Sequence, residues 1–427
     1  MANIIPFKGL KYDNNKVKFQ DVVSYPYDKI NKDLLKLFSE KSTYNIARLI
    51  KGDFIRDEKN DDWYDEVKQT LDKWIIDKIL KNSEKPCLYI YEQVYTCGEK
   101  TLRRISFSAL GELESFRKGN IKPHENTFSG PKQDRYKLLN ATHTNFGHIF
   151  MLFYGHKNNI IEKIKEKVSL INPECDFLDD FGIEHRFWEI SDKSFIEEIT
   201  SQMKEQNLLI ADGHHRYETA LEFYESMKDK DPENADKFKF RMMTFVDIND
   251  PSLVILPTHR VFYPEEETSK EVLMDRLNKH FEVSEPIAET DENKLKEILS
   301  KEAGNIPLFL MLADNDIYKI RMKESSYNSI EQVNKKLSVS VLQDFIAQDI
   351  FEKDVRSMAP GKDMDYHKNI KSVLKSVEEH PNSVGFILNP TLIEQVKAVV
   401  EVGGRMPQKS TDFYPKIYTG FVINKMD

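Results

Sequence analysis

Cysteine is scarce in this sequence, and long apolar runs are missing. The three cysteines, Cys87, Cys97 and Cys175, are far apart and form no CxxC pair, a pattern that argues against a disulfide framework or a zinc knuckle and is typical of a reducing compartment. The longest apolar runs, such as 149–154, fall far short of the roughly 20 residues that cross a bilayer. The first residues show no signal-peptide pattern. We therefore expect a cytoplasmic protein with no membrane span, whose thiols are bystanders.

An excess of positive charge is also missing. The sequence holds 62 Lys and Arg against 71 Asp and Glu, which gives a formal net charge of −9. Proteins that bind a nucleic-acid duplex usually present a basic face that displaces counterions from the phosphates. The charge balance therefore argues against nucleic acid as the main partner.

Several catalytic signatures are absent as well. No Gly-x-Gly-x-x-Gly, Gly-x-Ser-x-Gly or Gly-x-x-x-x-Gly-Lys-Ser/Thr pattern occurs, which removes the main support for a Rossmann dehydrogenase, an α/β-hydrolase or a P-loop enzyme. A metalloprotease needs HExxH, whereas His124-Glu125 is followed by Phe128 where the second histidine should stand. His214 and His215 are adjacent, and neighbouring side chains on a helix point in different directions. We predict no protein metal site.

The length and the pattern of elements indicate two domains of mixed α+β type. A chain of 427 residues is longer than a single core usually accommodates. Strand and helix signals follow no regular βα alternation, which favours a mixed sheet over a doubly wound one. The segment Pro264–Glu267 is the predicted linker. We expect one mixed-sheet domain over 1–265 and a charged, more helical α/β domain over 266–427.

Hydrophobic periodicity locates the main elements. A strand-like run begins at Asp21 and ends at a Pro26-Tyr27-Asp28 turn, and the helix that follows the loop from Pro123 is expected to be capped by Ser129 or Gly130. Further helices are predicted at 32–40, 63–80, 161–168, 269–281, 291–303 and 392–402. Further strands are predicted at 87–96, 103–113, 149–154, 187–190, 208–211, 242–248, 253–262, 307–312 and 384–388.

The clearest local unit is a strand, a turn and a helix around Asp212-Gly213-His214-His215-Arg216. N–H groups at a helix start attract anions, and a glycine lets a ligand approach the backbone. An arginine grips a phosphate or a carboxylate with two hydrogen bonds. Asp212 fits this place as a general base, a magnesium ligand or a helix cap. The cap explains Asp212 alone and not the basic residues beside it, so we favour a functional site.

A second cluster holds His124, Glu125, Lys132, Asp134 and Arg135, around the entry to another predicted helix. Lys132 and Arg135 are three positions apart, so both can lean to one face beside the helix N–H groups. The alternative is a solvated, charged loop. The packing of turn formers and ionisable residues into one loop favours a function.

Two shorter segments complete the candidates. After the helix stop at Gly403-Gly404, the run Arg405–Thr411 and the nearby Lys416 can bring Lys409 and Ser410 to a ligand, and an ordinary surface loop is the alternative. The segment Tyr25–Asp28 is a rigid turn that ends in a carboxylate. Alone, it is best interpreted as a plain turn.

Eight segments spread over the chain resemble a family of bacterial and archaeal proteins catalogued as a domain of unknown function. They are PFKGLKY, YPYDKI, YNIARLI, YIYEQVY, PHENTFSGPKQDR, ADGHHRYETAL, VILPTHR and MPQKSTDFYPKIYTG. That family is similar to the free serine kinases, whose fold belongs to the ParB/sulfiredoxin-like superfamily. The resemblance implies a ParB/sulfiredoxin-like catalytic domain over 1–265, in which a glycine–basic turn binds phosphates, with the C-terminal domain completing the cleft.

The resemblance also implies a reaction. A phosphoryl group would pass between a nucleotide, ATP or ADP, and the hydroxyl of free L-serine, with Mg²⁺, to form O-phosphoserine. Phosphoryl transfer depends on charge neutralisation and in-line positioning. Asp212 or Glu125 would take the hydroxyl proton, with His214 beside them. The residues that would bind phosphate or nucleotide are Gly213, His215, Arg216, His124, Lys132, Arg135, Lys409 and Ser410.

Two alternatives stay open. The same cradle would serve a phosphatase acting on phosphoserine or another small phosphate, and a ParB-like fold would also suit a non-catalytic nucleotide-binding protein. The small-molecule partners are L-serine or phosphoserine and a nucleotide, and a homodimer is left open. We also expect Arg216 to begin an exposed helical turn, so that Arg216→Ala should weaken ligand binding and leave stability nearly unchanged.

Overall fold

The structure is a computed structural model that describes residues 2–52, 62–125, 130–264, 269–353, 358 and 361–427. It divides into two compact units. Unit 1 comprises Met1–Pro123, Thr127–Val254 and Pro415–Asp427, and unit 2 comprises His124–Asn126 and Ile255–Tyr414. The chain thus leaves unit 1 after residue 254 and returns to it at residue 415. Among the described residues, no helix is long and apolar enough to cross a membrane.

This division differs from the expected single boundary at residue 265. β14 (His259–Phe262) pairs with two strands of unit 2, although its sequence continues directly from strands that precede it. Residues 415–427, expected in the second domain, pair with unit 1 instead. Pairing between strands far apart in the sequence determines to which unit both segments belong, and local composition does not reveal such pairing. Most of the predicted linker, and Ser129, lie outside the described residues.

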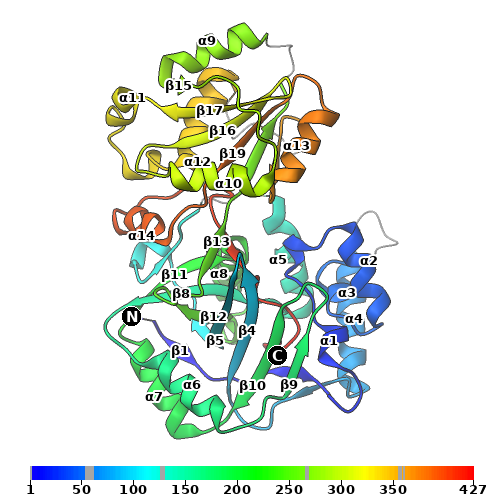
Figure 1. The fold of residues 1–427 in the computed structure, drawn as a ribbon. Coiled ribbons are helices and arrows are strands. Elements are labelled where there is room, and N and C mark those ends of the chain that lie inside the picture. Colours follow the sequence, from blue (N-terminus) through cyan, green and yellow to red (C-terminus); the bar gives the residue numbers. More distant parts are fainter. Residues whose placement is uncertain (1, 53–61, 126–129, 265–268, 354–357, 359–360) are drawn as a thin grey trace. The chain divides into compact units, whose positions relative to one another are not determined.

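Unit 1 is built on a nine-stranded mixed sheet with the order β6-β11-β8-β12-β5-β4-β10-β9, and β1 pairs with β5 (Figure 1). β11 runs parallel to β6, and β12 runs parallel to β8. The other pairs are antiparallel. The mixed sheet with its helices confirms the α+β prediction. The strands of the sheet are β1 (Ile4–Ile5), β4 (Leu88–Cys97), β5 (Lys100–Glu112), β6 (Ile121–Lys122), β8 (Ile149–Gly155), β9 (Cys175–Leu178), β10 (Glu184–Ile190), β11 (Gln206–Asp212) and β12 (Phe240–Asp247).

Helices α6, α7 and α8 pack on one face of this sheet and form the main core with it. Two small two-stranded sheets join β2 (Leu10–Tyr12) to β3 (Leu80–Asn82) and β7 (Thr144–Asn145) to β21 (Asn424–Lys425). The helical segments of unit 1 are α1 (Phe19–Val22), η1 (Tyr27–Lys29), α2 (Lys32–Lys41), α3 (Ala47–Ile50), α4 (Asp62–Ile76), η2 (Phe116–Lys118), α5 (Gly130–Thr142), α6 (Ile160–Ser169), α7 (Lys193–Met203), α8 (His214–Lys230) and η3 (Ala235–Phe238).

The strand expected from Asp21 is wrong in its first part. A single helical turn, α1, ends there at Val22, and the Val23 N–H donates to the Phe19 carbonyl at 3.1 Å. Ser24 beyond it forms an isolated antiparallel β-bridge with Thr419. Phe19 and Val22 are both buried, as residues three positions apart on one helical face can be. Four residues are too few for periodicity to distinguish a strand from a helical turn.

Unit 2 holds a six-stranded antiparallel sheet with the order β15-β17-β16-β19-β14-β18. Its core combines this sheet with residues of α10 and α13. The strands are β13 (Val254–Leu256), which begins at the unit boundary, β14, β15 (Phe281–Val283), β16 (Leu308–Ala313), β17 (Asp316–Met322), β18 (Met364–His367), β19 (Val384–Leu388) and β20 (Asp412–Tyr414). The helical segments are α9 (Lys270–His280), α10 (Glu292–Lys301), α11 (Glu324–Asn328), η4 (Val333–Lys335), α12 (Ser338–Val341), η5 (Leu342–Ile350), α13 (Ile370–Glu379) and α14 (Ile393–Glu401).

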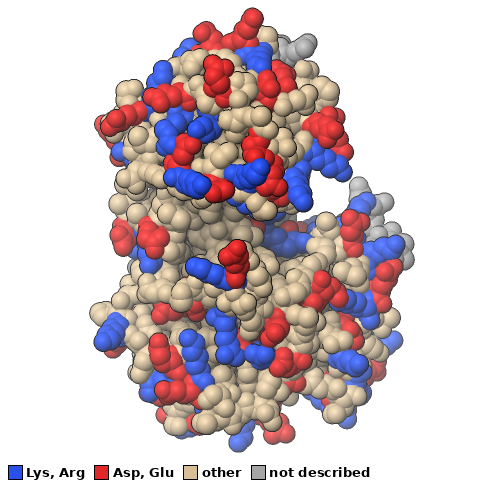
Figure 2. Space-filling model, in the orientation of Figure 1, with Lys and Arg blue, Asp and Glu red and all other residues tan. Residues whose placement is uncertain are grey.

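Charges of both signs are mixed on the face of the molecule in Figure 2. Several ion pairs follow helical spacing, such as Lys296 with Glu292 and Lys301 with Glu297. This face therefore lacks the broad basic surface that duplex-binding proteins use.

Candidate functional site

The predicted strand, turn and helix are present in unit 1. β11 is buried along most of its length and ends at Asp212, and α8 begins at His214. Gly213 between them has φ 95°, a left-handed conformation that residues with a Cβ atom rarely adopt. A Cβ atom there would also lie 3.1 Å from Arg216 Cζ. The glycine therefore lets the chain turn directly from a central strand into a helix.

Gly213, and not Asp212, is the N-cap residue of α8, and a glycine has no side chain with which to cap the helix. The first hydrogen bond inside the helix runs from the Tyr217 N–H to the Gly213 carbonyl at 2.9 Å. His214 is buried, and His215 is partly exposed. The cap interpretation of Asp212 is therefore wrong, and its carboxylate takes part in ion pairs instead.

The Asp212 carboxylate contacts two cations. Its Oδ2 accepts a hydrogen bond from Arg216 Nη2 at 2.9 Å, and its Oδ1 lies 3.5 Å from Lys416 Nζ. Burial alone would raise the pKa of Asp212, but Lys416, Arg216, Lys29 and His214 together hold that pKa well below its usual range. Asp212 is consequently ionised at neutral pH.

Lys29 and Lys416 bring two other sequence candidates to this turn. Lys29 belongs to η1, which continues the Tyr25–Asp28 segment whose simplest interpretation was a plain turn. Lys416 belongs to the C-terminal segment that returns to unit 1. Both cations contribute to the low pKa of Asp212, and nothing in the local sequence places either of them beside it.

Arg216 is held by the protein on two sides. Its Nη1 donates to the backbone carbonyl of His148, and its Nη2 donates to Asp212. Its side chain is only 9% exposed, so the expectation of an exposed helical turn is wrong. Burial, helped by Arg216 and Arg241, lowers the pKa of His148 to about 3. This histidine is therefore neutral at physiological pH and offsets none of the nearby charge.

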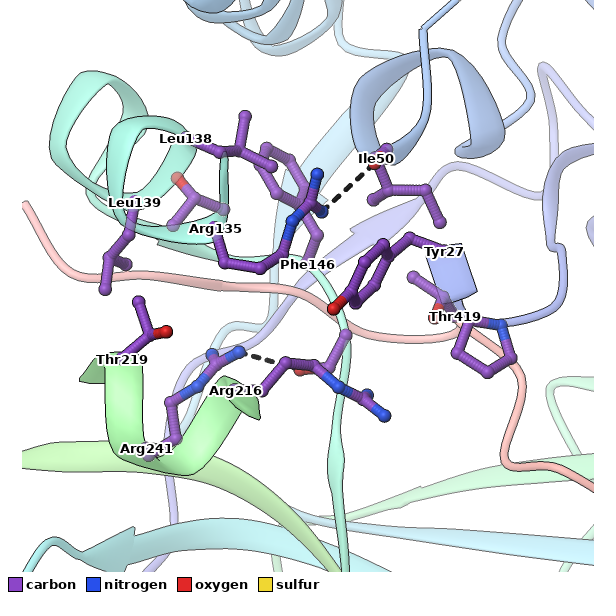
Figure 3. Close-up of a pocket in the computed structure, with 13 residues that line it drawn as sticks. Tyr27, Ile50, Arg135, Leu138, Leu139, Phe146, Arg216, Thr219, Arg241 and Thr419 are labelled. Atoms are coloured by element: carbon purple, nitrogen blue, oxygen red, sulfur yellow. Dashed lines mark hydrogen bonds between the residues drawn. The ribbon is translucent and has the colours of Figure 1, made fainter. Parts of the chain in front are cut away.

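A pocket of about 50 Å³ lies beside Arg216 in unit 1 (Figure 3). Arginines from three elements line it, namely Arg135 of α5, Arg216 of α8 and Arg241 of β12. A space of this size holds a few water molecules or one small polar group. The remaining lining residues are Pro26, Tyr27, Ile50, Leu138, Leu139, Thr144, Phe146, Gly147, Thr219 and Thr419.

Arg135 and Lys132, both expected to bind phosphate, lie in different surroundings. The Arg135 guanidinium lies 4.0 Å from the ring centroid of Tyr27, and it pairs with Asp134. Lys132 pairs with Glu218 of α8 and does not line the pocket. The two cations therefore do not share the expected common face, because Arg135 lines the pocket and Lys132 forms a partly buried ion pair.

Arg241 is a pocket residue that the sequence analysis missed. Its Nη2 donates to the Gly147 carbonyl at 3.1 Å, whereas its Nε and Nη1 are buried and find no hydrogen-bond partner among the described residues. The hydroxyl of Thr219 is buried and unpartnered in the same sense. The signal in the sequence was a single arginine inside the apolar strand FRMMTFVD, where a cation is out of place unless a function requires it.

In unit 2, His124 and Glu125 of the second sequence cluster meet the third cluster. His124 Nε2 lies 2.7 Å from Thr411 Oγ1, although the two residues are 287 positions apart. Glu125 Oε1 accepts hydrogen bonds from both the N–H and the hydroxyl of Thr411, each at 2.9 Å. The Met406 N–H donates to the His124 carbonyl at 2.7 Å. The Arg405–Thr411 segment is thus fastened to the His124-Glu125 loop and is not a loose surface loop.

Lys409 and Ser410 have contacts of their own, which join the segment to Arg260 and Thr391 of unit 2. The Lys409 carbonyl accepts a hydrogen bond from Arg260 Nη2 at 3.1 Å, and Lys409 itself has φ 57°. The Ser410 hydroxyl donates to the Pro407 carbonyl at 2.6 Å. The Ser410 carbonyl accepts from Thr391 Oγ1 at 2.9 Å.

The predicted site residues therefore fall into two groups. Asp212, the Gly213–Arg216 turn, Lys132 and Arg135 belong to unit 1, whereas Glu125 and its neighbours belong to unit 2. A common cleft for Asp212 and Glu125, and a contribution of Lys409 or Ser410 to it, stay predictions.

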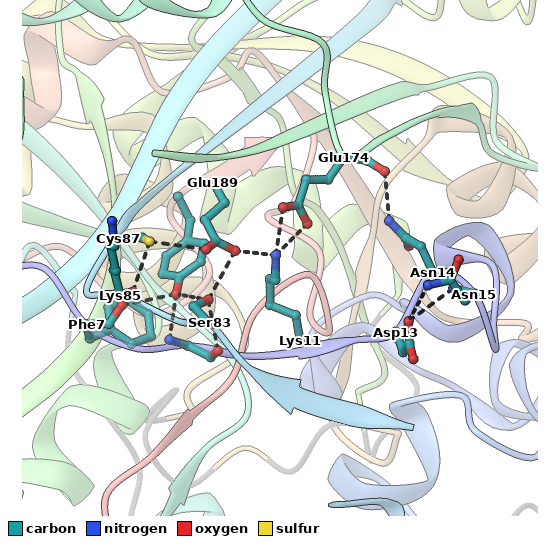
Figure 4. Close-up of polar contacts among 12 residues, drawn as sticks. Phe7, Lys11, Asp13, Asn14, Asn15, Ser83, Lys85, Cys87, Glu174 and Glu189 are labelled. Atoms are coloured by element: carbon teal, nitrogen blue, oxygen red, sulfur yellow. Dashed lines mark hydrogen bonds and ion pairs between the residues drawn. The ribbon is translucent and has the colours of Figure 1, made fainter. Parts of the chain in front are cut away.

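The cysteines lie apart from these groups. Cys87 belongs to a polar network in which Lys11 pairs with Glu174 and Glu189, and the Cys87 thiol lies 3.3 Å from Glu189 Oε1 (Figure 4). Burial, with the adjacent Glu189, raises the pKa of Cys87 to about 12, so the thiol stays protonated and unreactive. Among the described residues, no group of three or more His, Cys, Asp or Glu side chains is arranged to hold a metal ion.

Comparison with known proteins gives one family. The family model described as protein of unknown function (DUF1015) matches residues 4–340. No curated protein matches the chain.

Several solved structures are similar at low identity. A free serine kinase in complex with AMP is 13% identical, with 69% of this chain and 84% of that chain covered and a TM-score of 0.35. A conserved hypothetical protein from Pyrococcus furiosus is 14% identical, with 70% and 89% covered and a TM-score of 0.34. SbnI with C-terminal truncation from Staphylococcus aureus is 12% identical, with 74% and 87% covered and a TM-score of 0.33. These scores are too low to transfer a fold or an activity.

Proposed function

Because the chain belongs to the family described as protein of unknown function (DUF1015), we propose its function from the site itself: transfer of a phosphoryl group between a nucleotide and the hydroxyl of free L-serine. The observation that carries the proposal is the cationic turn between β11 and α8. Arg216, Lys416, Lys29 and His214 act together on the single carboxylate of Asp212. Positive charge thus exceeds negative charge at a helix start, which is a favourable place for phosphate oxygens.

Phosphoryl transfer requires an environment rich in positive charge. Little covalent chemistry falls to the protein, and most of the catalysis comes from neutralising charge and holding the reacting groups in line. Gly213 is the N-cap of α8 and His214 is its first residue, at the helix end that attracts a phosphate, while Arg216 and Arg135 add guanidinium groups. Arg216 is oriented before any ligand arrives, since Asp212 and the His148 carbonyl hold it.

We assign the two candidate carboxylates to different tasks. A carboxylate whose pKa lies far below its usual range accepts a proton weakly at neutral pH, so Asp212 orients the cations. Glu125 then remains as the base for the serine hydroxyl, with Lys409 and Ser410, which directly precede its partner Thr411, as nucleotide ligands. Mg²⁺, when bound, would neutralise charge on the nucleotide phosphates, held mainly by those phosphates and water and in part by Asp212.

Phosphorus NMR tests the reaction directly. The protein is incubated with L-serine, Mg²⁺ and ATP, ADP or pyrophosphate in turn, and with phosphoserine alone. Similar structures include free serine kinases in complex with AMP and with ADP, so ADP belongs in the screen. Phosphoserine formed only with a nucleotide supports the proposal. Free phosphate released from phosphoserine without a nucleotide would identify a phosphatase, and no turnover in any arm would overturn both.

Glu125→Gln sharpens this test, because glutamine keeps the Oε1 acceptor that Thr411 uses and removes only the charge. We expect turnover to fall by about 10²–10⁴-fold, the usual scale for loss of a general base, with nucleotide affinity nearly unchanged. Glu222→Gln is the matched control, since Glu222 is exposed on α8. Full activity in Glu125→Gln would remove Glu125 from the mechanism.

A further inference from the structure

Arg241 is a buried cation to which the proposed function gives no role. It lies on the buried strand β12 and is only 7% exposed. Its Nε and Nη1 are buried without a hydrogen-bond partner among the described residues, and its Nη2 reaches only the neutral carbonyl of Gly147. Removing a guanidinium group from water destabilises a fold strongly unless an anion is supplied in return.

Two of the three arginines around the pocket have an acidic partner, and Arg241 lacks one among the described residues. Arg135 is balanced by Asp134, and Arg216 is balanced by Asp212. Within the described parts of the chain, Arg241 has no ion pair with an acidic side chain. Burial and the neighbouring Arg216 lower the pKa of Arg241 to about 9. The guanidinium thus remains charged at neutral pH, and deprotonation does not resolve the imbalance.

We propose that this pocket is a binding site for a small oxyanion, a phosphate or carboxylate group, with Arg241 as its principal ligand. The donors are in place, because Arg241 Nε, Arg241 Nη1 and the hydroxyl of Thr219 are all buried and unpartnered at the pocket wall. Arg135 and Arg216 line the same space (Figure 3). Charge-assisted hydrogen bonds to a guanidinium are among the strongest that a protein offers to such a group.

The pocket also limits the size of its ligand. Its volume of about 50 Å³, bounded by Leu138, Leu139 and Phe146, suits one small anionic group. Oxyanion binding itself does not require the proposed reaction. Only the identification of this group as part of the substrate, such as the carboxylate of the amino acid or the phosphate of its product, rests on the proposed function.

Thermal unfolding of the full chain tests the site through Arg241→Met, which removes the charge and keeps an extended apolar side chain. Melting temperatures are measured in sodium phosphate, in sodium acetate and in sodium chloride at matched ionic strength. We expect phosphate, acetate or both to raise the melting temperature of the wild type above its value in chloride. Without oxyanion, Arg241→Met should melt at the same temperature or higher, because an unpaired buried charge has been removed. The oxyanion should then no longer raise it.

The change in melting temperature of Arg241→Met with and without oxyanion distinguishes a binding site from a structural role. If Arg241 only supports the fold, Arg241→Met lowers the melting temperature equally in all three salts, and the proposal is overturned. It is also overturned if neither oxyanion raises the melting temperature of the wild type. Arg103→Met is the matched control, because Arg103 is an arginine of the same sheet that is 61% exposed, and it should retain the full oxyanion effect.

A second variant covers the case in which Arg241→Met fails to fold. Thr219→Val replaces only the unpartnered hydroxyl by a methyl group, so the fold should remain intact. Titration calorimetry with the oxyanion that stabilises the wild type should give an affinity lower by roughly fivefold to tenfold, the scale of one hydrogen bond to a charged ligand. Unchanged affinity would overturn the assignment. Oxyanion binding that depends on Arg241, in a protein without phosphoryl transfer, would uphold the site and reject only the proposed reaction.

Discussion

Asp212 and Arg216 lie four positions apart across the start of α8, and each satisfies part of the hydrogen-bonding capacity of the other. An arginine held in this way loses little further conformational freedom when a ligand arrives. The ion pair has a second consequence, because both side chains are largely withdrawn from water. Removing one partner leaves the other charged and poorly solvated. Asp212 and Arg216 thus affect stability as well as binding.

A double-mutant cycle of Asp212→Asn and Arg216→Gln measures this pair. We expect each single variant to lower the free energy of unfolding by about 1–3 kcal/mol, less than for a completely buried pair, because Asp212 keeps 23% exposure. The double variant should lose less than the sum, with a coupling of about 1 kcal/mol. Since folding lowers the pKa of Asp212, this contribution is full at neutral pH and declines as the pH falls below about 4. Denaturant unfolding that gave additive losses would contradict the coupling.

The β11–Gly213–α8 element shows what local sequence does and does not reveal. A buried apolar run, a glycine and a helical repeat predict a strand, a turn and a helix, and the structure confirms them. The same reasoning makes α1 a strand, because four residues carry too little periodicity. Contacts that depend on tertiary pairing, such as His124 with Thr411 or Lys416 with Asp212, leave no local signal. Arg241 left one, a charge inside an apolar strand, but a single anomalous residue does not identify a pocket.

Gly213→Ala tests the turn as an element. Alanine at φ 95° is strained, and its Cβ atom would lie 3.1 Å from the Arg216 guanidinium. We expect a loss of about 1–3 kcal/mol of stability, together with a displaced Arg216 and weakened binding of nucleotide or phosphoserine. Gly119→Ala is the matched control, because Gly119 also has a positive φ, 80°, but an added Cβ atom meets no atom within 4 Å. Equal effects of the two variants on binding would show that backbone strain alone, and not the contact with Arg216, matters.

At the scale of the whole chain, unit 1 is discontinuous and its last segment is part of its core. Arg104 Nη2 donates to the Pro415 carbonyl, and Gln93 Nε2 donates to the Lys416 carbonyl at 3.0 Å. The Phe421 ring stacks on Phe187 with 5.3 Å between the centroids. A polypeptide that stops near residue 265, the boundary expected from sequence, therefore lacks both these contacts and the lysine beside Asp212.

Ending the chain after Tyr414 should consequently destabilise unit 1 far more than unit 2. Hydrogen–deuterium exchange measures the two separately, since β8 and β12 report on unit 1 while β16 and β19 report on unit 2. We expect protection of β8 and β12 to collapse in the shortened chain and protection of β16 and β19 to persist. Phe421→Ala in the full chain is the graded control, and the loss of one buried aromatic ring should cost about 3–5 kcal/mol. Protection of β8 and β12 in Phe421→Ala should therefore lie between that in the wild type and that in the shortened chain. Undiminished protection of β8 and β12 without residues 415–427 would show that unit 1 folds without this segment. Lys416 would then contribute to the charge around Asp212 but not to the folding of unit 1.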